Sequence, residues 1–182
     1  NYTAIAIQNA RLYNAAQEQA WIATIMLQVA EAAQSIGSIE ELLDTMVRLT
    51  PLLVGISKCA FFLWKEAQSA FVLTAAYGIE STRTHFDKDL PAFQRLRNAQ
   101  STLFIQDATL ELDLPDASVS PETGTLILLP LIARGEVLGA FLVAHESETP
   151  EGIISNFEQQ TLAILQGITH QTAVAVENIH LL

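Results

Sequence analysis

The sequence predicts an α+β fold, in which an antiparallel sheet of five to six strands is covered on both faces. Helical periodicity dominates the two ends of the 182-residue chain, and strand-like segments fill the middle. Two pairs of these segments, within residues 59–77 and 125–145, are each joined by a short turn, as in antiparallel hairpins. The strand at 59–64 is apolar at both odd and even positions, so both faces of the sheet need cover.

The N-terminal part of the chain predicts two helices. Over residues 2–34, apolar side chains recur every three or four positions. The sequence Ser-Ile-Gly-Ser at 35–38 interrupts this pattern. Ser38 followed by Glu41 has the spacing of a capping box, so a second helix is expected over residues 39–54.

Two prolines fall inside predicted elements. Pro51 lies in the second helix and has no amide hydrogen to donate, so we expect a kink or a break near Leu49. Pro130 lies in the predicted strand 125–133. Because proline cannot donate to a sheet ladder, this position is expected at an edge or at a bulge.

The rest of the chain predicts further strands, a long polar segment and a closing helix. Residues 78–123 are polar, with one predicted short helix at 90–98. A segment of this length with little regular structure is usually functional or disordered. The last predicted helix, 154–182, carries an apolar stripe that fits against a sheet and, past it, a second helix. The predicted strands are 59–64, 70–77, 103–105, 125–133 and 137–145.

The two ends of the chain resemble each other. Residues 3–12 read TAIAIQNARL and residues 172–181 read TAVAVENIHL, and five of the ten aligned positions are identical. The separation between them is the length of a domain. The repeat therefore predicts that residue 1 lies inside the last helix of a preceding, related copy. The alternative is chance similarity between two alanine-rich amphipathic helices.

Composition excludes several classes of partner. The chain has 9 Lys and Arg against 20 Asp and Glu, a net charge of −11, which opposes binding to nucleic acid and to anionic membrane surfaces. The single cysteine, Cys59, cannot form an internal disulfide or a thiolate cage, so a cytoplasmic protein is expected. No apolar run approaches the roughly 20 residues that span a bilayer.

The order of the predicted elements resembles the GAF domain, and three segments agree with it. Residues 130–142, PLIARGEVLGAFL, look like that family's strand–turn–strand signature, and residues 173–178, AVAVEN, resemble its terminal helix. Residues 5–13, IAIQNARLY, are similar to the same helix of an upstream copy. The resemblance covers residues 36–182. It implies terminal helices on one face of the sheet and, on the other, a loop and helix cover, 78–123, over a ligand-sized cavity.

The resemblance also implies an organisation and a function. Residues 1–35 would be a connecting signalling helix from a preceding GAF-like copy, residues 36–182 the GAF domain, and residues 154–182 its closing, output helix. The domain would sense a small molecule in a cytoplasmic signalling protein whose output domain is in the same polypeptide. Ligand binding under the cover would then shift flanking dimer helices. The alternative is a GAF-fold spacer that binds nothing and only dimerises and transmits.

The candidate ligand-binding residues lie on the predicted strands and in the cover. Aromatic and aliphatic side chains would form the walls of a pocket, and a histidine would be a polar anchor. In the alternative, bulky aromatic residues of the same region simply fill the cavity. The candidates are Phe61, Leu63, Phe86, Phe93, Leu96, Ile105, Phe141 and His145.

Charge is unevenly spread within the cover. Four of the nine cations fall within a short stretch, which would suit an anion-recognising rim or, as we favour, the solvated face of a short helix. The following stretch, 98–133, contains acids and no Lys or Arg, so a negative wall is expected there. The four cations are Arg83, Lys88, Arg95 and Arg97.

The terminal helices predict self-association. An apolar stripe that continues beyond a domain must be buried by a partner, and here it fits a parallel two-fold bundle. The alternative is that both helices pack on each other within one chain. The residues of the stripe are Ile5, Leu12 and Ile22 near one end, and Ile168, Ala175, Ile179 and Leu182 near the other.

No motif predicts catalysis or metal binding. A nucleophile elbow, a phosphate loop and a Ser-His-Asp ordering are missing from the sequence, and the four histidines are too widely spaced for a metal motif. The resemblance leaves the ligand unknown. It disfavours a covalent bilin, because residues 78–123 contain no cysteine, and a cyclic nucleotide, because that signature is absent. A sulfoxide reductase of this fold would need several cysteines.

Overall fold

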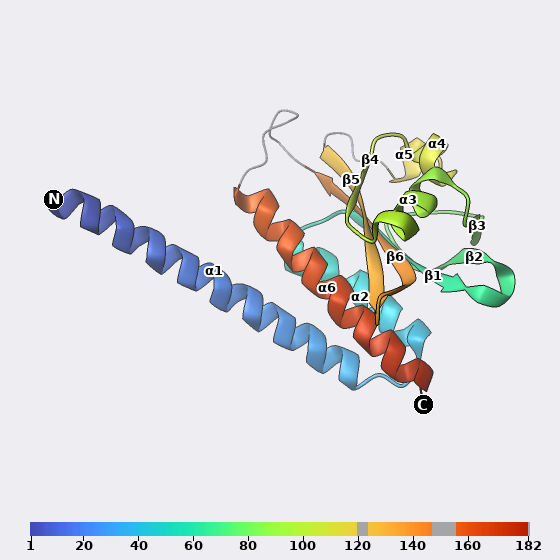
Figure 1. Cartoon of the computed structure of the whole chain (residues 1–182), viewed down its shortest axis with the longest axis horizontal. Coiled ribbons are helices and arrows are strands. Elements are labelled where there is room, and N and C mark those ends of the chain that lie inside the picture. The colour runs from blue at the N-terminus through green and yellow to red at the C-terminus, as the bar shows by residue number, and fades with distance from the viewer. Residues whose placement is uncertain (120–123, 147–155, 182) are drawn as a thin grey trace.

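The structure, a computed structural model, describes residues 1–119, 124–146 and 156–181. Six strands form one antiparallel sheet in the order β3-β2-β1-β6-β5-β4, and helices lie on both of its faces (Figure 1). The predicted α+β fold is therefore confirmed. The strands are β1 (Lys58–Lys65), β2 (Ala70–Tyr77), β3 (His85–Asp87), β4 (Leu103–Ile105), β5 (Gly124–Ala133) and β6 (Glu136–Glu146).

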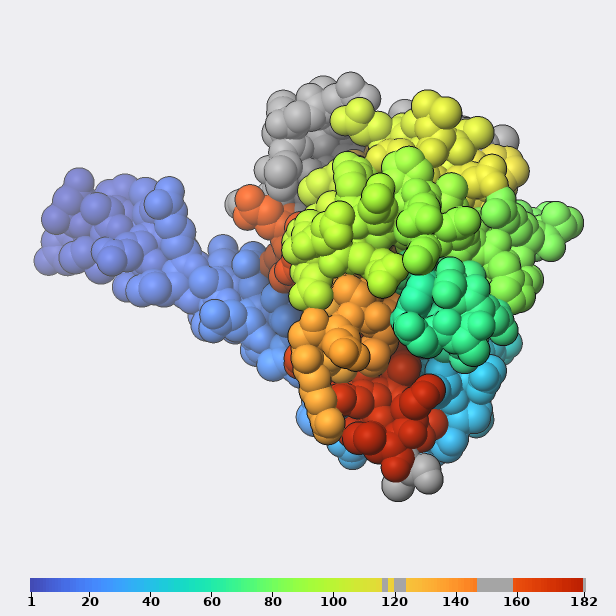
Figure 2. Space-filling model, turned by 45° about the vertical axis from the view of Figure 1, so that its right-hand side comes forward, coloured from blue at the N-terminus to red at the C-terminus, as the bar shows by residue number. Residues whose placement is uncertain are grey.

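Three helices form a layer on one face of the sheet: α1 (Tyr2–Gln34), α2 (Ile39–Val54) and α6 (Asn156–Leu181) (Figure 1). Only the C-terminal half of α1 joins the core, through Ile25, Val29 and Ala33. Its first half is exposed throughout and projects away from the body, as the blue arm in Figure 2 shows. The helical layer and the projecting arm thus share one continuous helix.

Helices α1 and α6 run parallel to each other along this layer. Trp21 lies near Gln160 at the beginning of α6, and Ala33 lies near Ala175 toward its end. Between these points α1 meets α6 at Gly167, where Met26 occupies the space that a side chain would need. The close approach of the two helices therefore depends on a residue without a side chain.

Alternate residues of each central strand face the two sides of the sheet. On β1, Cys59, Phe61 and Leu63 join the core beneath the helices. The intervening Ala60 and Phe62 join a second core on the opposite face. Both cores are apolar, which explains why β1 carries no alternation of polar and apolar residues.

The sequence predicted a kink or a break near Leu49; α2 continues through Pro51, so the break is wrong. The helix continues to Val54 and ends at Gly55, which has a left-handed φ of 67°. Pro51 leaves the carbonyl of Val47 without its usual helical donor. The Sγ of Cys59 donates to that carbonyl oxygen at 3.4 Å, so a strand residue supplies the bond that the proline removes.

The second proline agrees with its prediction. Strand β4 pairs with β5 only from Leu126 to Leu128, so Pro130 lies beyond the paired stretch on that side. A register shift follows between Leu131 and Ile132. The ladder therefore loses no bond to the missing amide hydrogen of Pro130 on this edge.

Gly139 allows β1 and β6 to pair closely at the centre of the sheet. A β-carbon at this position would clash with the carbonyl oxygen of Phe62 and touch Leu131. We expect Gly139→Ala to lower the free energy of unfolding by about 1–3 kcal/mol, because backbone atoms would have to move. Gly37→Ala is the matched control, since no atom lies within 4 Å of the added carbon. Equal urea midpoints for the two variants would contradict this prediction.

The opposite face of the sheet carries the cover, which is more structured than the sequence predicts. Besides the expected helix α3 (Pro91–Ala99), it contains α4 (Ala108–Leu112) and α5 (Asp116–Val119). The same segment of the chain also supplies the two edge strands of the sheet, the predicted β4 and the unpredicted β3. The extra helices are one turn long, too short for periodicity to predict. Residues 120–123 of the predicted cover lie outside the described residues. Within the described part of the chain, no helix combines the length and the apolar character needed to cross a bilayer.

Candidate functional site

Four phenylalanines, here called the aromatic cluster, pack together between the sheet and the cover: Phe62, Phe71, Phe86 and Phe93. The ring of Phe93 stacks on Phe71 with centroids 4.3 Å apart. It also meets Phe62 edge-on at 5.4 Å, and Phe62 meets Phe86 at 5.2 Å. All four side chains are at most 1% exposed. Such edge and stacked pairs are the favourable arrangements of aromatic rings.

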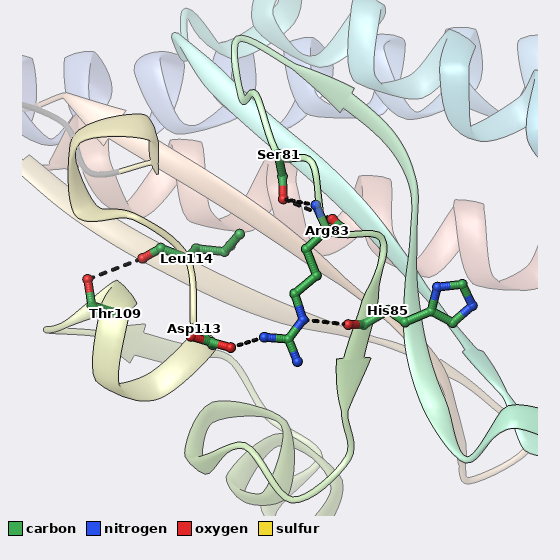
Figure 3. Close-up of polar contacts among 6 residues, drawn as sticks. All are labelled: Ser81, Arg83, His85, Thr109, Asp113 and Leu114. Carbon is green, nitrogen blue, oxygen red and sulfur yellow. Dashed lines mark hydrogen bonds and ion pairs between the residues drawn. The ribbon is translucent and has the colours of Figure 1, made fainter.

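Arg83 joins two parts of the cover, the segment that precedes α3 and the segment that follows α4, as its contacts with His85 and Asp113 show (Figure 3). Its guanidinium pairs with the carboxylate of Asp113, and its Nε donates to the carbonyl of His85 at 2.8 Å. The Cζ atom of this guanidinium lies 5.3 Å from the ring centroid of Phe86. Asp113 ends α4 with a left-handed φ of 53°, which turns the chain there. One side chain therefore connects the segment before α3 to the segment after α4.

Two further arginines bind the cover rather than forming an open rim. Arg95 on α3 pairs with Glu111 on α4. The guanidinium of Arg97 lies 4.6 Å from the ring centroid of Trp64 on β1. Three of the four clustered cations thus have partners within this domain.

The acids of the expected negative wall are used inside the cover in the same way. Asp107 caps α4, because its Oδ1 accepts from the amide of Leu110 at 2.9 Å. The Oε2 of Glu111 accepts from the amides of Gln106 at 2.9 Å and Asp107 at 3.2 Å. Among the described residues, no group of three or more histidine, cysteine, aspartate or glutamate side chains is placed to hold a metal ion. The pairs Arg95–Glu111 and Arg83–Asp113 join residues 16 and 30 positions apart, so no local sequence pattern predicts them.

The predicted ligand-binding residues divide between the two faces of the sheet. Four of them line the cover side together: Phe86, Phe93, Leu96 and Ile105. Three others, Phe61, Leu63 and Phe141, belong to the core under the helices, where Phe61 and Phe141 stack at 4.1 Å. The physical reason is strand alternation, because Phe61 and Phe62 are neighbours and must point to opposite faces. The eight residues therefore do not line a single pocket.

His145, the predicted polar anchor, also lies on the helix side. It is 9% exposed and lines a small cavity of about 100 Å³ near the start of α6. Thr125, Ile127 and Thr161 line the same cavity. The sheet separates this histidine from the aromatic cluster, so it does not contact a molecule under the cover.

The predicted dimer residues divide in a similar way. Ile168 is fully buried, and Ala175, Ile179 and Ile22 pack against the core within the chain. Ile5 and Leu12 are exposed, at 55% and 62%. Leu182 lies outside the described residues. The described α6 half of the stripe is therefore largely buried in the core of this chain, whereas the N-terminal half of α1 is exposed.

Comparison with known proteins agrees with this geometry. The family model described as "GAF domain" matches residues 38–178. Among curated proteins, none matches the chain. Solved structures with the same fold include the GAF domain of a phosphoenolpyruvate-protein phosphotransferase from Coxiella burnetii, with a TM-score of 0.70 and 14% identity, covering 88% of this chain and 95% of that one.

Two further structures show how widely the fold is used. One is residues 122 to 287 of a methyl-accepting chemotaxis protein, with a TM-score of 0.65 and 17% identity, covering 87% of this chain and 99% of that one. The other is free methionine-R-sulfoxide reductase from Neisseria meningitidis in complex with its substrate, with a TM-score of 0.65 and 13% identity, covering 88% and 90%. At these identities the likeness concerns the fold.

Proposed function

Because this chain belongs to the GAF domain family, we propose that it is a regulatory module of a signal-transduction protein, passing a signal through the helix pair α1–α6. GAF domains occur in multidomain proteins, as in the phosphoenolpyruvate-protein phosphotransferase above. The proposal places an output domain in the same polypeptide and places the protein in the cytoplasm. It assigns no nucleic acid or membrane partner, consistent with the charge of −11.

The parallel packing of α1 and α6 on one face of the sheet is the observation that carries this proposal. Both helices contribute to the same core, through Ile25 and Val29 on one side and Ile168 on the other. At Gly167 they approach so closely that a β-carbon would meet Met26. Packed interfaces of this kind respond to small shifts by changing between discrete arrangements. A movement of one helix would therefore be passed to the other.

The aromatic cluster favours transmission without a ligand under the cover. Its four rings pack against each other and are almost completely buried. A molecule entering between α3 and the strands β1, β2 and β3 would have to displace these packed rings. This supports the spacer, which dimerises and transmits, over a sensor with a preformed cavity.

Small-molecule sensing is the second candidate, and the ion pairs of the cover favour it. Arg83–Asp113 and Arg95–Glu111 join the two halves of the cover, and both arginines are about half exposed. Exposed pairs contribute about 0–1 kcal/mol each, so a ligand with a modest preference for an open cover could separate the halves. Phe86, Phe93 and Ile105 would then become its walls.

Self-association through the projecting half of α1 completes the proposed mechanism. Ile5 and Leu12 are seven residues apart and exposed on one side of the helix, as in a parallel two-helix bundle. The first 20 residues contain one basic residue, Arg11, and one acidic residue, Glu18. The arm is thus electrically neutral in a chain of net charge −11, so repulsion between copies is weakest there.

The proposal assigns no reaction to the module. The only thiol, Cys59, is fully buried, and desolvation raises its pKa to about 12. A nucleophilic or redox cysteine needs access and a populated thiolate. Cys59 has neither in this arrangement.

Native mass spectrometry of the freshly purified chain, compared with its denatured mass, tests the proposal. A dimer without extra mass is expected for the transmitting module. A dimer with a defined excess mass would instead support small-molecule sensing and begin to identify the ligand. A monomer would contradict the proposed bundle.

Acidic substitutions on the exposed side of α1 test the proposed two-helix bundle. We expect Ile5→Glu combined with Leu12→Glu to convert the dimer to a monomer, because two carboxylates would meet across the two-fold axis. Leu52→Glu with Leu110→Glu is the matched control, since both leucines are exposed and lie off α1. Sedimentation or light scattering reads the mass. A dimer that survives the α1 substitutions would place the interface elsewhere.

A further inference from the structure

The repeated segment at the two ends of the chain has its resemblance concentrated at buried positions. In α6, the buried residues of segment 172–181 are Thr172, Ala173, Ala175 and Val176. The aligned residues of segment 3–12 are Thr3, Ala4, Ala6 and Ile7. Three of these four pairs are identical, and the fourth replaces valine with isoleucine. Chance similarity between two helices would not be expected to favour the positions that pack.

The segment of α6 packs closely because these residues are small. Its buried side belongs to the core that contains Ala33 of α1, Met46 of α2 and Leu129 of β5. Small residues let a helix approach a neighbouring element closely, and larger ones hold it off. Segment 3–12 offers the same small, apolar side, yet every one of its residues is exposed.

We propose that Thr3, Ala4, Ala6 and Ile7 form a second closing-helix surface, whose partner is another GAF-like body that precedes them in the same polypeptide. The partner would present the same kind of surface that receives segment 172–181 here, namely two helices and one face of a sheet. The orientation fits, because a closing helix docks by its C-terminal turns and its own body comes before it. Helix α1 is then shared by two bodies.

This surface is distinct from the proposed dimer face. At 3.6 residues per turn, Ile5 and Leu12 lie on the side of α1 opposite to Thr3 and Ile7. Their counterparts in α6, Val174 and Leu181, are also exposed. The helix can therefore dock on a preceding body and still present Ile5 and Leu12 to a second chain. Docking on a preceding body does not require that α1 and α6 transmit a signal.

A graft within this chain tests the proposed surface. Replacing residues 172–181 by the sequence of residues 3–12 requires five substitutions: Val174→Ile, Val176→Ile, Glu177→Gln, Ile179→Ala and His180→Arg. All four buried positions keep a residue of the same kind. We expect the graft to fold cooperatively with a melting temperature within about 8 °C of the wild type, allowing for the smaller residue at 179 and the lost Arg134–Glu177 pair.

The matched control places residues 13–22 of the same exposed helix at 172–181. This sequence, YNAAQEQAWI, puts a bulky aromatic residue and two amides at buried positions. We expect the control to lose more than about 15 °C or to fail to fold. The proposal is overturned if the 3–12 graft is as unstable as the control, or if both grafts are equally stable.

A second measurement separates a preceding body from a second copy of this chain as the occupant. Ala4→Glu with Ile7→Glu in the 182-residue chain is expected to leave its oligomeric mass unchanged. Conversion of a dimer to a monomer by these two substitutions would show that a second copy covers the surface, and would overturn the proposal.

Discussion

A Phe93→Ala variant is expected to lose about 3–5 kcal/mol of unfolding free energy, the range typical of removing a buried phenylalanine from a packed core. Phe93 is the ring through which the aromatic cluster is connected, because it contacts Phe71, Phe62 and Phe86. The surrounding rings come from strands β1, β2 and β3, which are paired in the sheet and restrict collapse into the cavity. Urea denaturation followed by circular dichroism measures the loss.

Phe104→Ala is the matched control for this substitution. Phe104 is also a phenylalanine and lies on β4, the strand that follows α3 in the chain, but its side chain is 52% exposed. Its replacement is expected to change the unfolding free energy by less than about 1 kcal/mol. A loss for Phe93→Ala as small as the loss for Phe104→Ala would mean that the aromatic cluster contributes little to stability. It would also remove the main argument against a ligand under the cover.

The second large effect is expected at alkaline pH and concerns Cys59. Burial raises the pKa of its thiol from 9.0 to about 12, whereas in the unfolded chain the thiol ionises at its ordinary value. Above pH 9 the unfolded state therefore binds fewer protons than the native state, and stability falls as the pH rises toward the native pKa. The wild type should lose about 1.4 kcal/mol for each pH unit in this window, or about 3 kcal/mol by pH 11.

A Cys59→Ser variant isolates this contribution. Its hydroxyl can still donate to the carbonyl of Val47, as the thiol does at 3.4 Å, but it does not ionise in this range. Every other ionisable group is present in both chains, so the difference between the two unfolding free energies isolates the thiol. From pH 9 to pH 11 the wild type should steadily lose unfolding free energy relative to the Cys59→Ser variant. A constant difference would show that the buried thiol ionises without cost.

If the aromatic cluster contributes several kcal/mol, opening the cover fully is costly, and a signal passes more readily along α1 and α6 than through the space above the sheet. The ion pairs of the cover contribute far less, because Arg83 and Arg95 are about half exposed. Native mass spectrometry of the Phe93→Ala variant beside the wild type would show whether a vacated cluster retains a small molecule.

The sequence alone predicted the elements near the ends of the chain well, because their signals are local. Helical periodicity and the Ser38 cap determine where α1 ends and α2 begins, and the polar turns place the β1–β2 and β5–β6 hairpins. Pro130 was assigned to an edge or bulge because proline cannot donate, whatever the surroundings. Of the kink or break predicted near Leu49, the break did not occur, and the sequence could not show that a distant residue, Cys59, bonds to the carbonyl that Pro51 leaves free.

Only the tertiary structure decided which side each apolar residue of the sheet takes. Phe61 and Phe62 are adjacent and equally apolar, so the sequence could not show that one packs under α2 and α6 and the other under the cover. The pairing of β1 with β6, of α1 with α6, and of Arg83 with Asp113 joins residues far apart in the chain. Such contacts depend on how complete elements pack, and this packing leaves no local pattern in the residues that make it.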